Sequence, residues 1–243
     1  MLRNAKTTFS PHARFKLGVI VRTALRPELN RLLLVARIKE GETEGKVWTK
    51  IESSIPKIIA KGVTPLYLSK RSHHLDTSLI VSAPSVDVLL EILLDILSGT
   101  TSADSILIFQ LVKPKFFDIP ENIGKEATRF LITIAVRPAD AMRVYDLIAG
   151  FRQSSDFAIT YLAFTCQSYC DTLTLSAFAK STDHMNRFVE QELKAIPQIS
   201  RVTTTPLTKS KRLLPYAEMV RVLRNEVGDI SIARPMMDLT DLL

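Results

Sequence analysis

Two stretches of this chain begin with the same dipeptide, Asp-Thr, followed by strand-like residues, and the spacing between them limits what the chain can fold into. Asp76 begins Asp-Thr-Ser-Leu-Ile-Val-Ser-Ala, and Asp171 begins Asp-Thr-Leu-Thr-Leu-Ser-Ala-Phe-Ala. The two aspartates lie 95 residues apart (171 minus 76). Each stretch has the composition of a strand and is followed by a helical pattern and a second strand. The sequence therefore predicts one small α/β module that is used twice.

The first half of the chain contains the apolar patterns of four strands and two helices. Pro56 lies within the first helical pattern and is expected to kink or split that helix. Pro84 and Asp87 are typical of the first turn of the second helix. The strands are predicted over 31–38, 64–72, 76–83 and 105–112, and the helices over 46–60 and 86–97.

The second half repeats that order. Its strands are predicted over 130–136, 157–166, 171–179 and 199–207, and its helices over 138–152 and 182–196. The order β-α-β-β-α-β in each half is that of a ferredoxin-like unit. Nearly continuous apolar runs in the strands need cover on both faces of the sheet. We therefore predict an α+β fold of two tandem ferredoxin-like (βαββαβ) modules, packed sheet to sheet as a pseudo-dimer, with short N- and C-terminal extensions.

Proline, glycine and charge mark the predicted boundaries. Pro114, Pro120 and Gly124 indicate a linker between the modules. Helical spacing of apolar residues over 216–227 predicts one extra helix after the second module. The predicted domains are a basic N-terminal extension (1–30), a first module (31–114), a linker (115–128), a second module (129–211) and a C-terminal helix and tail (212–243).

The composition is that of a globular protein with a basic surface. A hydrophobic content of 46% in 243 residues supplies a sizeable core and argues against disorder. The net charge of +7 indicates a moderate attraction to polyanions. Basic residues lie near both ends of the chain, and they would form one phosphate-binding patch if the ends converge. The candidate nucleic-acid residues are Arg14, Lys16, Arg22, Lys209, Lys211 and Arg212.

Cys166 and Cys170 have a CxxxC spacing, which leaves three interpretations open: a disulfide, half of a metal site, or two ordinary small residues. A zinc site needs two more soft ligands nearby, so no metal and no cofactor is predicted. The first ten residues have no apolar run of the signal-peptide kind, and the longest apolar stretch, 86–97, is too short to span a bilayer. These features predict a cytoplasmic protein in a reducing compartment.

The second module carries a family pattern. Glu192-Leu-Lys-Ala-Ile-Pro-Gln-Ile leads into Ser200-Arg-Val-Thr-Thr-Thr-Pro-Leu-Thr-Lys-Ser-Lys-Arg, and a loop with its Asp-led strand lies over 165–175. These residues resemble the end of the ligand-sensing (RAM) domain of the leucine-responsive Lrp/AsnC, or feast/famine, regulatory family. The resemblance covers 129–211, and in 31–114 it rests on element order and the Asp76 strand. It implies domains that dimerise through their sheets, assemble into homo-oligomers and bind amino-acid effectors near the loop before the Asp-led strand.

Two features depart from that family. No complete helix-turn-helix precedes the first module, and the family's glycine three residues before the aspartate is replaced by His73 and Ser168. Turn residues are the other interpretation of this polar group, with Asp76 accepting backbone hydrogen bonds. The candidate ligand-binding residues implied by the resemblance are His73, His74, Asp76, Ser168, Tyr169 and Asp171.

No catalytic motif is present: the chain has no GxSxG, Walker loop, HExxH or CxxC. The sequence therefore predicts a non-enzymatic, Lrp/AsnC-like regulatory or interaction protein, acting in transcription regulation with a DNA partner and sensing a small effector between its modules. The alternative is a basic nucleic-acid- or ribosome-associated protein that uses the fold as a platform. An enzyme would need a pocket with perturbed titratable groups.

Overall fold

The first half of the chain folds into four strands and three helices. The structure, a computed structural model, describes residues 31–40, 45–72, 76–102, 105–117, 127–151, 153–166, 172–227 and 231–232. The first-half elements are β1 (Leu32–Lys39), α1 (Lys46–Ser53), α2 (Ile55–Ala60), β2 (Thr64–Arg71), β3 (Asp76–Ala83), α3 (Val86–Leu97) and β4 (Ile106–Phe116). The helix predicted over 46–60 is split at Ser54, because Pro56 has no N–H to continue it and suits the start of a new helix.

The second half has the same order of elements and ends in an extra helix. Its elements are β5 (Thr128–Val136), η2 (Pro138–Asp140), α4 (Ala141–Ala149), β6 (Phe157–Cys166), β7 (Leu173–Ala179), α5 (Thr182–Phe188) with η3 (Val189–Leu193), β8 (Ile199–Arg212), α6 (Tyr216–Val222) with η4 (Leu223–Val227), and β9 (Ser231–Ile232). Ser85 and Ser181 cap α3 and α5, each accepting a hydrogen bond from the backbone N–H three residues later.

The strands form one large antiparallel sheet that closes on itself. The pairing order is β1-β3-β2-β8-β5-β7-β6-β4, and β4 pairs again with β1. Two of these pairings join the halves of the chain: β2 with β8, and β4 with β6. The short strand β9 adds to β4 in parallel. The fold is therefore a mixed α+β fold, and β1–β8 form what we call the closed sheet.

The two joining strands are longer than the sequence pattern indicates. The sequence pattern ends these strands at residues 112 and 207, whereas β4 continues to Phe116 and β8 to Arg212. These extra residues supply most of the pairing between the halves, with Lys115 and Phe116 opposite β6 and residues 209–212 opposite β2. The expectation that two separate sheets pack face to face therefore differs from the structure, in which they join edge to edge.

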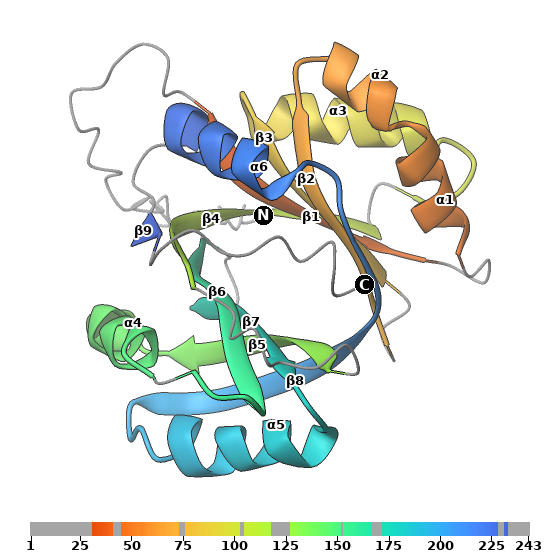
Figure 1. The fold of residues 1–243 in the computed structure, drawn as a ribbon. Coiled ribbons are helices and arrows are strands. Elements are labelled where there is room, and N and C mark those ends of the chain that lie inside the picture. The colour runs from red at the N-terminus through yellow and green to blue at the C-terminus, as the bar shows by residue number, and fades with distance from the viewer. Residues whose placement is uncertain are drawn as a thin grey trace, which may run out of the picture.

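Helices cover the outer face of the closed sheet in two groups. Figure 1 shows α1, α2 and α3 together on one side, and α4 and α5 on the opposite side. Each group has its own apolar core: Trp48, Ile51 and Leu93 belong to one, and Tyr145 and Phe188 to the other. None of the helices in the described part of the chain is long and apolar enough to cross a membrane.

A third apolar cluster lies on the inner face. Side chains alternate along a strand, so Leu34 on β1 packs with the helices while Leu33 and Val35 point inward. The inner cluster also contains Val222, the last residue of α6, and Leu223, the first residue of η4. The α6 segment therefore packs against the inner face of the closed sheet. We call the space that this inner face surrounds the interior.

Candidate functional site

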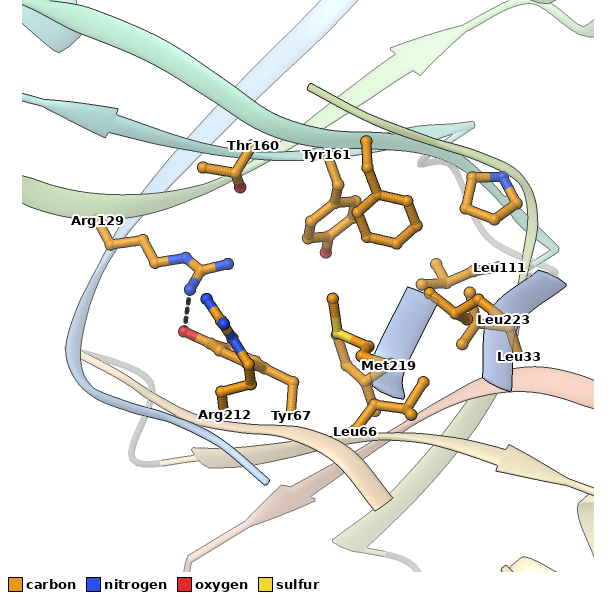
Figure 2. A pocket seen from close by; sticks show the side chains of 13 residues that line it. Leu33, Leu66, Tyr67, Leu111, Arg129, Thr160, Tyr161, Arg212, Met219 and Leu223 are labelled. Carbon is orange, nitrogen blue, oxygen red and sulfur yellow. Dashed lines mark hydrogen bonds between the residues drawn. The ribbon is translucent and has the colours of Figure 1, made fainter. Parts of the chain in front are cut away.

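The interior contains a small, mostly apolar cavity between the inner faces of the strands and α6 (Figure 2). Its volume is about 70 Å³, measured as the space open to the centre of a water-sized sphere. A single water needs roughly 10–15 Å³ by this measure, so the cavity has room for on the order of five waters. It is lined by Leu33, Leu66, Tyr67, Ile80, Leu111, Pro114, Phe116, Arg129, Thr160, Tyr161, Arg212, Met219 and Leu223.

Two β-bulges aim side chains into this cavity. The pairing of β2 with β3 skips Leu66, and the pairing of β6 with β7 skips Thr160. A bulge inserts an extra residue and re-aims its neighbours, whereas a regular strand would point consecutive side chains to opposite faces. As a result, Leu66 with Tyr67, and Thr160 with Tyr161, line the cavity as consecutive pairs.

Arg129 is a charged group at the cavity that several contacts hold in place. Its Nε donates a hydrogen bond to Ser176 Oγ at 2.8 Å, and one Nη donates to the Tyr67 hydroxyl. The guanidinium carbon lies 4.3 Å from the centroid of the Tyr67 ring and 5.5 Å from that of Phe178. Among the described residues, no carboxylate forms an ion pair with Arg129. The cavity therefore faces a fixed cation that no carboxylate in the described ranges neutralises.

Tyr161 places a weak acid in the same cavity. Burial raises the pKa of its phenol above the ordinary value, although the nearby charge of Arg129 and a hydrogen bond with Thr174 act in the opposite direction. The phenol is therefore protonated at neutral pH and available as a proton donor. Thr160 beside it is buried, and its hydroxyl donates to the Ser176 carbonyl at 3.1 Å.

The basic stretch at 209–212 is part of β8, and its side chains separate to two faces. Lys209 lies over the Trp48 ring at 4.4 Å, and Lys211 donates to Glu52 at 2.6 Å, both on the helix-covered face. Arg212 points the other way and lines the cavity. The structure therefore divides the residues that the sequence grouped as a nucleic-acid patch; Arg14, Lys16 and Arg22 lie outside the described residues.

Asp76, the first aspartate of the repeated phrase, is paired within the fold. Arg71 Nε donates to its Oδ1 at 2.6 Å, Arg71 Nη2 contacts its Oδ2, and both side chains are buried. A ligand-binding role for Asp76 stays a prediction. The other residues predicted for that site, His73, His74, Ser168, Tyr169 and Asp171, lie outside the described residues.

The sequence alone does not identify the cavity residues, because the sequence pattern that marks them is only two residues long. Tyr67-Leu68 and Tyr161-Leu162 form a repeated dipeptide spaced by 94 residues (161 minus 67), close to the 95 of the two aspartates. That agreement of spacing was the one available sign that both tyrosines occupy corresponding places. Arg129 has no counterpart of the same type, and sequence pattern alone could not connect it to Tyr67.

Comparison with known proteins identifies relatives of the fold. No family model and no curated protein sequence matches this chain. The structure is similar to that of a provisionally assigned monooxygenase from Fusobacterium nucleatum subsp. nucleatum, with a TM-score of 0.50 and 13% identity over 76% of this chain and 95% of the other. It is also similar to the siroheme decarboxylase NirDL, with a TM-score of 0.52 and 11% identity over 75% of this chain and 72% of the other. At these identities the likeness shows a shared fold alone.

The same decarboxylase in complex with an iron-uroporphyrin III analogue matches with a TM-score of 0.50 and 12% identity, over 75% of this chain and 72% of the other. These matches overturn the family that the sequence suggested. The resemblance of 129–211 to the Lrp/AsnC RAM domain is wrong, because the similar structures are enzymes of other kinds. The order β-α-β-β-α-β is shared by proteins of unrelated function, so it could not separate these families.

Several functional predictions depended on that resemblance and are wrong with it. They are the non-enzymatic regulator, the roles in transcription regulation and DNA binding, the amino-acid effector, the nucleic-acid partner and the homo-oligomer. The alternative of a nucleic-acid- or ribosome-associated platform also finds no support among the similar structures. The interior cavity, which the sequence did not predict, is the site that remains.

Proposed function

We propose that this protein is an enzyme whose active site is the interior cavity, where a small and largely apolar organic substrate receives a proton from Tyr161. One observation carries the proposal: a protonated phenol and an arginine without a carboxylate partner face the same apolar cavity. A concave apolar site with a few convergent polar groups and a perturbed pKa is the usual form of an active site. The similar structures, which are of enzymes, support this interpretation.

The two polar groups have complementary roles in the proposed reaction. In the exchange beside a carbonyl, water removes a proton from the neighbouring carbon, and the electron pair of that C–H bond moves to the carbonyl oxygen. That oxygen takes the proton of Tyr161, which burial keeps neutral, to give an enol, and the phenolate recovers a proton from the hydronium ion just formed. The positive charge of Arg129 stabilises the negative charge that develops before the transfer. Ser176 and Tyr67 hold the guanidinium in place, so it does not need to reorganise during the reaction.

A tetrapyrrole does not fit this cavity. Two of the similar structures are named for siroheme and contain or act on tetrapyrrole-type molecules. Here, however, the cavity admits on the order of five waters, far less than a macrocycle of four pyrrole rings requires. The residues that line it include no histidine and no cysteine, and no three metal-ligating side chains converge in the described ranges. We therefore assign no step of the reaction to a tetrapyrrole.

The position of the cavity supports a finer description of the fold. We propose that the two halves are tandem ferredoxin-like modules, 31–114 and 129–211, arranged as a pseudo-dimer whose interior is the active site. The matching strand orders, β4-β1-β3-β2 and β8-β5-β7-β6, support it. The linker 115–128, the extensions 1–30 and 212–243, and a cytoplasmic location stay predictions.

Proton transfer in the cavity is testable with deuterium. The intact protein is incubated in D2O with small carbonyl compounds, both neutral (butanone, butanal) and anionic (2-oxobutyrate), and exchange beside the carbonyl is followed by ¹H NMR. We expect exchange with at least one compound, and a loss of at least tenfold in rate for Tyr161→Phe. Tyr145→Phe is the matched control, because that hydroxyl donates to the Lys113 carbonyl outside the cavity. Absence of exchange with every compound, or equal rates in Tyr161→Phe and the parent protein, would overturn the proposal.

A further inference from the structure

We infer that the substrate of the interior cavity is a short-chain aliphatic carboxylate, bound with its charged group at Arg129 and its apolar part toward Leu33 and Leu223. This inference rests on the proposed function, because it names the substrate class of the same cavity. It follows from a comparison of corresponding positions in the two halves of the chain.

The two cavity tyrosines occupy corresponding places. Tyr67 follows the β2 bulge and pairs with Ile80 of β3. Tyr161 follows the β6 bulge and pairs with Ser176 of β7. Each tyrosine is followed by a leucine on the helix-covered face. The two halves therefore present the same phenol from the same register.

The strand pairs next to the tyrosines extend this correspondence. Ile80 pairs with Val35 of β1, and Ser176 pairs with Leu131 of β5. The residues two positions earlier on these strands, on the same face, are Leu33 and Arg129. Both line the cavity. The place held by leucine in the first half is thus held by arginine in the second.

Two further places show the same difference. The bulged residue before the tyrosine is Leu66 in the first half and Thr160 in the second. The third place is the residue that pairs with a tyrosine across the junction of the halves. Phe116 of the first half pairs with Tyr161, and Arg212 of the second half pairs with Tyr67. At every one of these places the first half contributes an apolar side chain and the second a polar or charged one. The cavity therefore has apolar side chains from the first half and polar or charged side chains from the second, although the strands of the two halves correspond.

The polar side chains gather at one end. In Figure 2, Arg129, Arg212 and Tyr67 lie together, while Leu33, Leu111 and Leu223 lie at the other end of the cavity. The lining contains two arginines and no aspartate or glutamate. Arg129, which forms no ion pair with a carboxylate of the described residues, leaves a positive charge at this end, so this end of the cavity favours a negatively charged group.

The geometry of Arg129 selects a carboxylate among such groups. A guanidinium has five N–H donors, and hydrogen bonds to Ser176 and Tyr67 use two of them. The planar fork of the remaining donors matches the two oxygens of a carboxylate. Size then limits the rest of the molecule. A cavity of roughly 150 Å³ is known to hold benzene, and this cavity has less than half that volume. A short aliphatic chain fits, and an aromatic ring does not.

Butyrate and butyramide test the inference, because the two have nearly the same shape and differ in charge. Binding of each to the intact protein is measured by isothermal titration calorimetry. We expect butyrate to bind at least tenfold more tightly, and Arg129→Gln to remove that preference. Arg143→Gln is the matched control, since Arg143 is exposed on α4 and its loss removes the same charge from the outer surface. Arg129→Lys, which keeps the charge, retains a preference for butyrate and covers the case in which Arg129→Gln does not fold.

The outcomes separate the two proposals. Equal binding of butyrate and butyramide, or a preference for butyrate that persists in Arg129→Gln, would overturn the carboxylate inference and leave the cavity as the binding site. Failure of both ligands to bind, or binding that is undiminished when Leu111→Phe fills the cavity, would overturn the cavity as the active site.

Discussion

Arg129 and Tyr67 come from different halves of the chain, and the guanidinium of one lies 4.3 Å from the ring centroid of the other while donating a hydrogen bond to its hydroxyl. Tyr67 belongs to β2 and Arg129 to β5, and the two strands are separated in the closed sheet by β8. The contact therefore crosses the interior side of the junction between β2 and β8. It contributes to the stability of the fold as well as to the site.

Replacing Tyr67 by phenylalanine tests the strength of this contact. Tyr67→Phe keeps the ring under the guanidinium but removes the acceptor oxygen, and hydrogen bonds to charged groups contribute about 1.5–3 kcal/mol. We expect the free energy of unfolding, measured by urea denaturation, to fall by that amount. Tyr145→Phe removes a hydrogen bond to the uncharged Lys113 carbonyl and should cost about 0.5–1.5 kcal/mol. A smaller loss for Tyr67→Phe than for Tyr145→Phe would contradict the interpretation.

The Arg71–Asp76 ion pair gives a second prediction. Both side chains are buried, so Asp76→Ala leaves a buried guanidinium without its partner. We expect a loss of about 3–5 kcal/mol in the free energy of unfolding. The exposed pair of Lys57 and Asp95, 2.8 Å apart, supplies the control: Asp95→Ala should cost less than about 1 kcal/mol.

The double replacement Arg71→Leu with Asp76→Leu separates pairing from burial. Because it removes both charges, we expect it to recover most of the stability that Asp76→Ala loses. A double variant no more stable than Asp76→Ala would show that the charges themselves, rather than the unpaired arginine, determine the loss.

The sequence predicts the strands and helices of this fold well where apolar periodicity is strong. Leu89 and Leu93 define α3, and the structure places that helix at the predicted residues. The ends of β4 and β8 were not predictable in the same way. Lys113-Pro114-Lys115 and Lys209-Ser210-Lys211-Arg212 read as a linker and a basic patch, yet they continue strands because β6 and β2 supply partners from the other half. Local propensity cannot report a partner that lies far away in the chain.

The candidate site was less accessible to sequence reasoning for the same reason. The bulges at Leu66 and Thr160 depend on register between strands, which no local pattern encodes here. Without those bulges, Tyr67 and Tyr161 could not be placed in the interior. Arg129 was assigned to the start of the second module, and its contact with Tyr67 spans 62 residues.

Glu40 predicts a dependence of stability on pH. Burial alone would raise the pKa of this carboxyl, but hydrogen bonds from Thr77, the Gly45 backbone N–H and Lys70, with the charge of Lys70, bring the pKa below its ordinary value. A carboxyl with a lowered pKa in the folded state stabilises the protein above its unfolded pKa of about 4.5, and this contribution is lost as the pH falls through the folded pKa.

Glu40→Gln should therefore destabilise the protein at pH 7 and lose much of its effect in acid. Thermal denaturation of the parent and the variant between pH 7 and pH 3 checks this expectation. The difference in Tm should be largest near pH 7 and should shrink below about pH 4.5, where the unfolded chain takes up a proton. A difference in Tm that stays constant across this range would show that Glu40 acts through its shape and not through its charge.

Leu223 determines the size of the cavity. Its side chain is 1% exposed and packs from the segment after α6 against the inner face of the closed sheet. Leu223→Ala removes buried methyl groups from the cavity wall, so we expect a loss of about 2–5 kcal/mol in the free energy of unfolding and a larger cavity. Leu147→Ala on α4, where the leucine is 45% exposed, is the control and should cost well under half as much.

The enlarged cavity should change which ligands bind. Benzoate carries the carboxylate that Arg129 recognises, but its ring exceeds the space available in the parent protein. Calorimetric titration should therefore detect benzoate binding to Leu223→Ala and not to the parent or to Leu147→Ala. Binding of benzoate to the parent with equal affinity would show that α6 moves to admit larger ligands, so that the cavity volume of this structure does not limit the substrate.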